Sequence, residues 1–200
     1  MRKLAFFRKR TFSLKQEALF HLALNEFLIP KKQLRIDHES GHCYNNGKEY
    51  SVIFPLSFFR LIKGIETQKT VNYFFTGQHN KDRDWVKYFE APNNQILFTN
   101  KGREISKTTF DYDYYKGLKQ AKFAICPKGD FTWTYRFIES AMCKAIPIID
   151  SSETHPMMEG FIWYDYKEQE KHIFKEEIVN HNYKLVIQRH SLLSDFLDTF

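Results

Sequence analysis

The sequence has no long apolar run. No window of it approaches the roughly 20 consecutive apolar residues that a membrane-spanning helix needs. The first ten residues are basic, but only Leu4 to Phe7 are apolar, so this stretch lacks the apolar region of a secretory signal peptide. We therefore expect the protein to stay in the cytoplasm.

Cysteine is also scarce. Cys43, Cys126 and Cys143 are too few and too scattered for a disulfide framework or a zinc knuckle. Cys126 and Cys143 lie in apolar stretches, which predicts buried free thiols. His38, His42 and Cys43 lie close together in the sequence, but their spacing matches no standard zinc-binding set. We predict no metal site.

Internal repeats and low-complexity linkers are absent, which favours one large domain, or one domain with a short appendage. The 30 Lys and Arg exceed the 24 Asp and Glu, giving a formal charge of +6. Such a charge suits nucleic acid, a nucleoside diphosphate or a membrane surface. No zinc-finger, RRM-like or basic-zipper pattern is present, so we expect no nucleic-acid partner. Peripheral contact with a membrane stays open, and nothing indicates an oligomeric state.

The first part of the chain contains one strong helical pattern. Ser13-Leu14-Lys15-Gln16 has the form of a capping box, and apolar residues follow at helical spacing until Pro30. Residues 33–50 are polar and turn-rich, and Asn45-Asn46-Gly47 predicts a turn. We expect residues 1–50 to form a short helical and loop appendage.

From about residue 70, patterns typical of strands alternate with helical ones. The expected strands are Val71–Phe75, Gln95–Thr99, Lys122–Cys126, Ala145–Ile149 and Phe161–Tyr164. The expected helices are Asp84–Phe89, Tyr114–Gln120, Thr134–Lys144 and most of the remaining chain. This alternation predicts βαβ units and a parallel sheet, and the apolar run Ala145–Ile149 fits a strand buried on both faces. The expected fold over residues 51–200 is a Rossmann-like, doubly wound α/β domain.

Ligands of such sheets bind outside the carboxyl ends of the strands. In the loop after the first strand, Gly77 and Gln78 could bring backbone amides to a phosphate, although a plain strand-to-helix turn is the alternative. The loop after the third strand contains Lys128 and Gly129 and leads into a helix, whose N-terminus suits a diphosphate. Lys128 fits a phosphate ligand and a solvated loop cation equally well.

The helix after this loop adds further candidates. Thr132 and Thr134 could cap it and donate to phosphate oxygens. Arg136 would present a bidentate fork to the phosphate, and Glu139, three residues later, could accept both ribose hydroxyls. The alternative for these two residues is a surface ion pair of little energetic value. Trp133 could stack on a base or a sugar, or pack in the core.

This region resembles the exostosin-like glycosyltransferases and, more loosely, the carboxyl-terminal lobe of two-lobed GT-B sugar transferases. The matching pattern is an Ala-Lys-Phe strand, Cys-Pro-Lys-Gly, an Arg-Phe-Ile-Glu-Ser helix and then Ile-Pro-Ile-Ile. The resemblance covers residues 110–150 closely and 50–165 in outline. It implies that Arg136 binds the diphosphate and Glu139 the ribose of a nucleotide sugar.

The implied function is transfer of a hexose or pentose from a nucleoside diphosphate sugar to a carbohydrate or glycoconjugate acceptor, without a cofactor. Many retaining GT-B transferases have a second Glu where this chain has Phe131, so we expect inversion. Asp111-Tyr112-Asp113 spells the metal-binding motif of another transferase class. It precedes a short helix, however, so we predict that it caps that helix and that transfer is metal-independent.

An inverting transfer needs a base on the acceptor side. Asp37, His38 and Glu39 are the candidates in residues 1–50, although most such polar clusters are only loop. These fifty residues are too few for a full acceptor-binding lobe. The alternative function is therefore a non-catalytic module that binds a nucleotide sugar.

Overall fold

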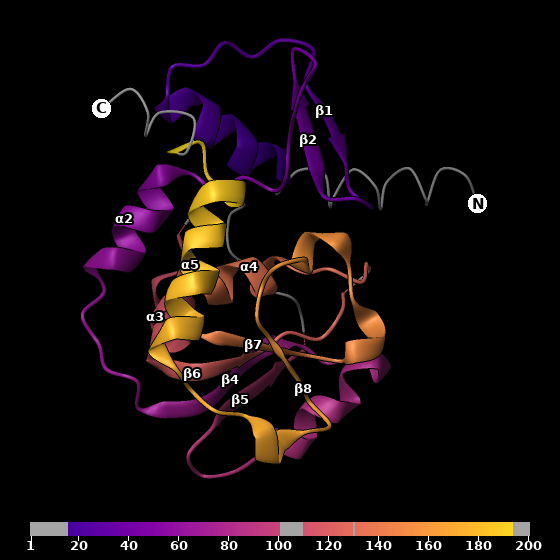
Figure 1. The fold of residues 1–200 in the computed structure, drawn as a ribbon, viewed down its shortest axis with the longest axis vertical. Coiled ribbons are helices and arrows are strands. Elements are labelled where there is room, and N and C mark those ends of the chain that lie inside the picture. Colours follow the sequence, from indigo (N-terminus) through magenta and orange to yellow (C-terminus); the bar gives the residue numbers. More distant parts are fainter. Residues whose placement is uncertain (1–15, 101–109, 130, 194–200) are drawn as a thin grey trace. The chain divides into compact units, whose positions relative to one another are not determined.

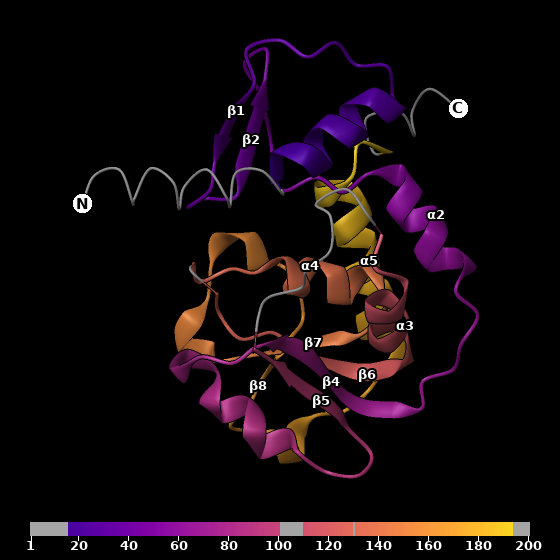
Figure 2. The same ribbon diagram turned by 180° about the vertical axis from the view of Figure 1, so that it is seen from behind.

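A computed structural model of the chain describes residues 16–100, 110–129 and 131–193. These residues form two compact units (Figures 1 and 2). Unit 1 comprises the described residues within Met1–Arg60, Ile105–Phe110 and Ile187–Phe200, and unit 2 comprises those within Leu61–Glu104 and Asp111–Val186. The assignment of residues 1–50 to an acceptor side stays a prediction, because it concerns a function that the fold does not reveal.

Unit 1 contains a helix over residues 16–26 and a three-stranded antiparallel sheet. The strands are β1 (Arg35–Asp37), β2 (His42–Asn45) and β3 (Lys48–Tyr50). The sequence predicted the helix but not this sheet. The predicted turn is confirmed, since Asn46 and Gly47 between β2 and β3 have φ angles of 52° and 81°. Ser13 of the expected capping box lies outside the described residues, and the side chain of Gln16 instead donates to the carbonyl oxygen of Gly41.

The core of unit 1 joins the helix to the sheet. A cluster of buried residues unites the helix, β2 and two later segments: Phe20, Ala23, Leu24, Cys43, Ile53 and Leu192. The last turn of helix α5 (Glu176–His190) belongs to this unit, where the backbone N–H of Phe54 donates to the carbonyl oxygen of His190 at 2.8 Å. The apolar residues of the first helix therefore pack in the core, as their periodicity predicts.

Unit 2 is built on a five-stranded parallel sheet, as the sequence predicts. Its strands are β4 (Val71–Gln78), β5 (Gln95–Thr99), β6 (Ala121–Ile125), β7 (Ile146–Ile149) and β8 (Tyr164–Asp165). They lie in the order β5-β4-β6-β7-β8, and every neighbouring pair is parallel. The chain first moves from β4 outward to β5 and then returns past β4 to β6. The order of winding therefore reverses between β4 and β6, and such a switch point is where doubly wound sheets bind ligands.

The remaining elements are helical. The α-helices are α2 (Leu56–Gly64), α3 (Tyr112–Gln120), α4 (Tyr135–Met142) and α5 (Glu176–His190). The 3₁₀ segments are η1 (Lys81–Phe89), η2 (Ser151–Glu153), η3 (Pro156–Met158) and η4 (Gln169–Lys171). The helices predicted after residue 70 are confirmed within a few residues, and the one predicted at Asp84–Phe89 is the 3₁₀ segment η1. The strand expected at Phe161–Tyr164 is wrong except for its last residue. No helix in the described ranges has the length and apolar character to cross a bilayer.

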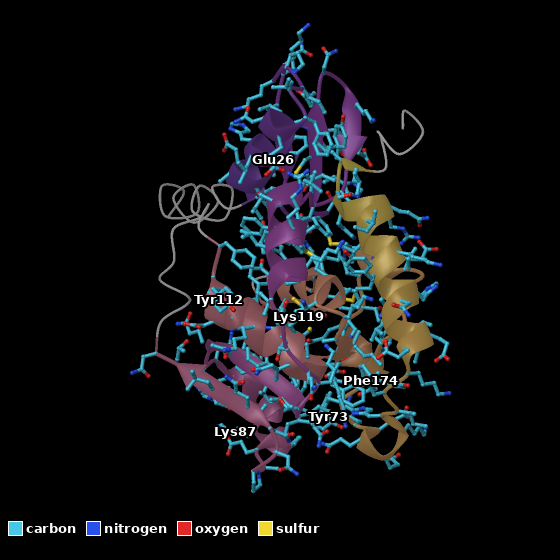
Figure 3. All side chains as sticks on the ribbon, turned by 90° about the vertical axis from the view of Figure 1, so that its left-hand side faces the viewer. Glu26, Tyr73, Lys87, Tyr112, Lys119 and Phe174 are labelled. Carbon is cyan, nitrogen blue, oxygen red and sulfur yellow. The ribbon has the colours of Figure 1, made fainter. Side chains whose placement is uncertain are left out.

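Alternate residues of the strands pack on opposite faces of the sheet, as the pleat requires. One face forms a buried cluster with η1: Phe75, Phe123, Ile125, Ile146 and Ile148 from the strands, and Trp85, Val86 and Phe89 from η1. Tyr73 and Phe174, which are labelled in Figure 3, pack against this cluster. On the other face α3 lies so close to β4 that the Phe74 ring leaves no room for a Cβ on Gly117.

Two lysine side chains, Lys119 and Lys69, form hydrogen bonds to backbone carbonyl groups of unit 2. Lys119, also labelled in Figure 3, donates to the carbonyl oxygen of Ile62 near the end of α2 at 2.8 Å. Lys69 donates to the carbonyl oxygens of Ala121 and Cys143 at 2.7 and 3.2 Å.

Cys143, like Cys126, is a buried free thiol, which confirms the prediction for both residues. Burial raises the pKa of Cys126 to about 12.

Candidate functional site

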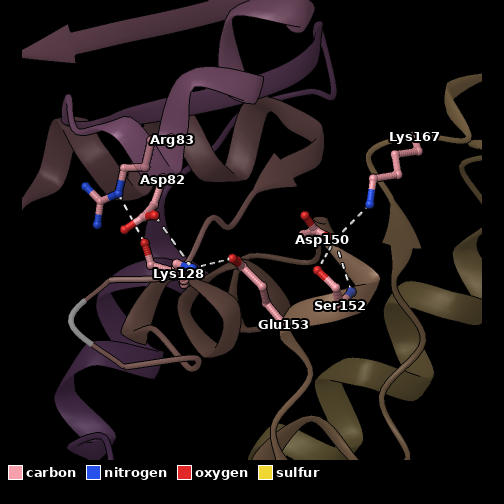
Figure 4. Close-up of polar contacts among 7 residues, drawn as sticks. All are labelled: Asp82, Arg83, Lys128, Asp150, Ser152, Glu153 and Lys167. Carbon is pink, nitrogen blue, oxygen red and sulfur yellow. Dashed lines mark hydrogen bonds and ion pairs between the residues drawn. The ribbon is translucent and has the colours of Figure 1, made fainter.

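The loops after β4 and β6 meet at the switch point of the sheet and are held together by Arg83 of η1. Its Nη1 donates to the carbonyl oxygen of Gln78 at 2.8 Å, and its Nε donates to the carbonyl oxygen of Lys128 at 3.2 Å. The second of these bonds is drawn in Figure 4. No sequence pattern predicted a role for Arg83, whose only signal is its position shortly after the first predicted strand. The structure therefore brings Gln78 and Lys128, two predicted site residues, to one edge.

Arg136 reaches the same edge from the first turn of α4. Its Nη2 donates to the carbonyl oxygen of Thr76 at 2.6 Å, and its guanidinium carbon lies 4.5 Å from the centre of the Phe75 ring. A Cβ on Gly77 would lie 2.7 Å from Nη2 of Arg136, so this close approach requires a glycine. Gly77 and Arg136, predicted from separate segments, are thus neighbours in space.

Two buried polar atoms at the start of α4 have no hydrogen-bond partner among the described residues. They are Oγ1 of Thr134 and Nε of Arg136. Thr134 stands at the N-cap position as predicted, but its side chain makes no capping bond, which corrects the predicted capping role. Buried polar groups without a partner are rare and destabilising. A ligand with acceptor oxygens at this helix end would satisfy the Arg136 donor.

Lys128 is paired with carboxylates. Its Nζ lies 2.8 Å from Oε1 of Glu153 on η2 and 3.7 Å from Oδ1 of Asp82 on η1 (Figure 4). The hydrogen bond with Glu153 raises the pKa of Lys128, so the ammonium stays charged at neutral pH. The other carboxylate oxygen of Glu153, Oε2, is buried and has no partner among the residues described. A phosphate would have to compete with these carboxylates for Lys128.

The loop after β7 flanks this cluster. The carboxylate of Asp150 accepts from the backbone N–H and the hydroxyl of Ser152 at 3.0 and 2.7 Å, and Lys167 lies 3.2 Å from it (Figure 4). These bonds fix the start of η2, which carries Glu153. The loop after β7 therefore positions the partner of Lys128.

The other candidates of the α4 loop differ in exposure. The backbone N–H of Gly129 donates to the carbonyl oxygen of Phe131 at 3.1 Å, which closes the loop. Thr132 is exposed, whereas Trp133 is only 5% exposed and packs edge-on against the Tyr135 ring. Of the two interpretations of Trp133, core packing is the one that its burial favours.

Glu139 is buried beneath α4, with 1% of its surface exposed. Its two carboxylate oxygens accept hydrogen bonds from the hydroxyls of Tyr114 and Tyr115 on α3, at 2.9 and 3.1 Å. The guanidinium of Arg136 is directed instead toward Thr76, so the geometry differs from the surface pair considered as an alternative. The ribose-binding role of Glu139 stays a prediction, and it requires a ribose to share or displace the tyrosine hydroxyls.

Asp111 caps α3, as predicted. Its Oδ1 accepts from the backbone N–H of Tyr114 at 3.1 Å. Across the part of the chain that the structure describes, no three His, Cys, Asp or Glu side chains are grouped so that they could hold a metal ion. Asp111 thus has a structural role at the start of α3.

The predicted base candidates lie in unit 1, in and beside the turn that joins β1 to β2. Oδ1 of Asp37 accepts from the backbone N–H groups of Glu39 and Ser40 at 3.1 and 3.2 Å, and the Ser40 bond is the main cause that lowers the pKa of Asp37. Nδ1 of His38 lies 3.0 Å from Oε1 of Gln16, and Glu39 is exposed. These contacts shape the turn, and a carboxylate with a lowered pKa is a weaker base.

Comparison with known proteins adds no assignment: no protein-family model matches the chain, and no curated protein matches it. The resemblance to exostosin-like transferases therefore stays a prediction. The function has to be argued from the geometry of the switch point.

Proposed function

We propose that the switch point of unit 2 binds the diphosphate of a nucleoside diphosphate sugar, and that the protein transfers this sugar to a carbohydrate or glycoconjugate acceptor. The observation that supports this proposal most strongly is the placement of Arg136. Its guanidinium is seated on Phe75 and Thr76 beside Gly77, at the edge where a doubly wound sheet binds its ligand.

The guanidinium of Arg136 is suited to a diphosphate. Arginine presents donors in a planar fork that matches phosphate oxygens. Contacts with Thr76 and Phe75 already hold the side chain, so binding would cost little additional side-chain entropy. Arg83 lies at the same edge, and the positive end of α4 favours an anion there; the charge of Lys128 is offset by Glu153 and Asp82.

The same groups would act in the reaction. During transfer an acceptor hydroxyl bonds to the anomeric carbon while the bond from that carbon to the diphosphate breaks, and the electron pair stays on the leaving phosphate. Arg136 and the start of α4 would stabilise the charge that develops there. The displacement would be single, inverting and metal-independent, as we expect from Phe131 and from the position of Asp111-Tyr112-Asp113 before a helix.

The test is titration calorimetry with UDP, GDP and inorganic pyrophosphate. Arg136→Ala removes a charge-assisted bond worth about 1.5–3 kcal/mol, so affinity should fall roughly ten-fold or more. Arg136→Lys should restore only part of it, because an ammonium does not reproduce the fork. Arg35 offers a matched control, since its guanidinium lies 4.4 Å from the Tyr44 ring in unit 1. If Arg136→Ala binds all three ligands as the parent does, the proposed site is wrong.

A second candidate function is a non-catalytic module that binds a nucleotide sugar. The hydrogen bonds of Asp37 and the lowered pKa that they cause favour it, because they weaken one predicted base. Turnover separates the two functions. The module is supported if UDP or GDP binds but the protein neither hydrolyses the corresponding nucleotide sugars nor transfers the sugar from them.

A further inference from the structure

His79 is the first residue after β4, and three contacts fix its position. Its Nε2 lies 2.9 Å from Oδ1 of Asp84 on η1. Its ring packs edge-on against Phe98 of β5, with centroids 5.1 Å apart, and its backbone N–H donates to the carbonyl oxygen of Thr99. A histidine held in this way has a defined ring orientation although its side chain is 45% exposed.

The partner of His79 determines which ring nitrogen carries the hydrogen. Asp84 also accepts from Lys87 at 3.1 Å, and the bonds from Lys87 and His79 lower the pKa of its carboxyl. Because an ionised carboxylate can only accept, Nε2 of His79 must be the protonated nitrogen of the neutral ring. Its Nδ1 then has a free lone pair, and no described residue bonds to it. The side chain that carries this nitrogen is 45% exposed to solvent.

In the sequence, His79 follows the proposed phosphate-site residues Gly77 and Gln78 directly. Gly77, two residues before it, contacts Arg136, and the carbonyl of Gln78 is held by Arg83. Asp84 follows Arg83 directly on η1, so this one short helix holds both the loop at the phosphate site and the histidine ring. A base at this place belongs to the same unit and the same sheet edge as the site.

We propose that His79 is the general base of the sugar transfer and that Asp84 is its positioning residue; this inference depends on the proposed function. Nδ1 takes the proton of the acceptor hydroxyl as its oxygen bonds to the anomeric carbon, and the diphosphate leaves with the electron pair of the broken bond. The resulting imidazolium is stabilised by the carboxylate of Asp84 and afterwards loses its proton to water. With water as acceptor, the same step hydrolyses the donor.

The experiment measures turnover of UDP-glucose, UDP-xylose and GDP-mannose by the 200-residue chain, with water and with mono- and disaccharide acceptors. His79→Ala should lower the turnover rate about 10²–10⁴-fold, the usual contribution of general base catalysis, while Kd for UDP and GDP stays within two-fold. Added imidazole should restore part of the rate. Asp84→Asn should lower kcat with little change in KM, and Asp84→Glu should recover part of it.

Unit 1 provides a matched control. His42 and Glu49 form a similar exposed pair at 3.1 Å, with side chains 39% and 54% exposed, against 45% and 57% for His79 and Asp84. His42→Ala and Glu49→Gln should leave turnover unchanged, and imidazole should have no effect on them. Equal rates for His79→Ala and the parent, or no rescue by imidazole, would overturn the assignment.

Binding and turnover distinguish this inference from the proposal on which it depends. If the parent binds UDP or GDP through Arg136 but turns over none of the three donors, His79 is not a base and only nucleotide binding stands. If neither nucleotide binds, the site itself is wrong and the base fails with it.

Discussion

Gly77 and Arg136 touch at the carboxyl end of β4: a Cβ on the glycine would stand 2.7 Å from Nη2 of the arginine and 3.2 Å from the Phe75 ring. The backbone here has an ordinary strand conformation, so the glycine is needed for space and not for a positive φ angle. The missing side chain makes room for the guanidinium on which the proposed site depends.

Gly77→Ala should therefore act as an indirect substitution of Arg136. The added methyl displaces the guanidinium, so affinity for UDP and pyrophosphate should fall toward that of Arg136→Ala. Because both changes remove the same contact of Arg136 with the ligand, the double variant should bind about as weakly as Arg136→Ala alone. Calorimetry of the three variants tests this expectation.

Gly129→Ala is the control from the same edge. A Cβ there meets its nearest atoms, in Arg83 and Thr134, at 3.7 Å, which is an ordinary van der Waals contact. The fold should tolerate this methyl with little loss of stability in urea. Additive losses for Gly77→Ala and Arg136→Ala would contradict a shared contact.

The buried Glu139 predicts a loss of stability upon substitution. In Glu139→Gln the amide nitrogen replaces one acceptor oxygen, so the O–H of Tyr114 or Tyr115 loses its acceptor in the interior. The free energy of unfolding should fall by about 1–3 kcal/mol, and by about 1 kcal/mol for Tyr115→Phe. Urea unfolding measures both values, with the exposed Glu90→Gln as control.

The ribose-binding role predicts a further result for Glu139→Gln. Binding of UDP should then weaken while pyrophosphate binds as before, in addition to the loss of stability. Calorimetry with the two ligands therefore separates a structural role from a binding role.

The parallel sheet could be predicted because its signals are local. The run Ile146–Ile149 is wholly apolar, as a strand buried on both faces must be, and helical patterns flank it. The sheet of unit 1 gave no such signal. Its strands have only three or four residues and are largely polar on their exposed side. Turn chemistry at Asn46 and Gly47 predicted the hairpin corner but not the strands beside it.

The site was predictable by residue type but not by contact. Arg136 and Glu139 share one helical face in the sequence pattern, which suggested a common ligand. In the structure they separate, because Thr76 and Phe75 hold the arginine while two tyrosines of α3 bury the glutamate. These partners depend on how α3 and α4 pack on the sheet. The periodicity and spacing of the sequence do not reveal this packing. For the same reason they do not reveal that Arg83 contacts the loop after β6.

The ion pair of Lys128 and Glu153 predicts a gain of affinity upon substitution. Glu153→Gln removes a carboxylate that lies 2.8 Å from the ammonium, so phosphate no longer competes with it for the cation. Affinity for pyrophosphate should rise several-fold, and the gain should shrink at 0.5 M salt because charges near the surface are screened. Lys128→Ala should remove the gain. A Glu153→Gln variant that binds pyrophosphate more weakly would instead indicate that Glu153 receives the ligand.

The buried His190 predicts that acid destabilises unit 1. It is 1% exposed, and its Nδ1 donates to the carbonyl oxygen of Val52 at 2.8 Å. Burial lowers the pKa of His190 to about 4, below the value of about 6.5 in an unfolded chain. The folded state therefore favours the neutral ring. The stability that this preference contributes is complete above pH 6.5 and is lost as the pH falls toward 4.

The loss should reach about 3 kcal/mol, since each unit of pKa difference corresponds to about 1.4 kcal/mol. The backbone N–H of Phe54 is a local reporter, because it donates to the carbonyl oxygen of His190. Its protection factor, the ratio of the intrinsic to the observed exchange rate, should fall as the pH is lowered from 6.5 to 4. His190→Asn keeps a donor for Val52 but does not titrate, so its protection should depend less on pH. Equal pH dependence in the parent and this variant would show that a neutral buried His190 does not stabilise unit 1.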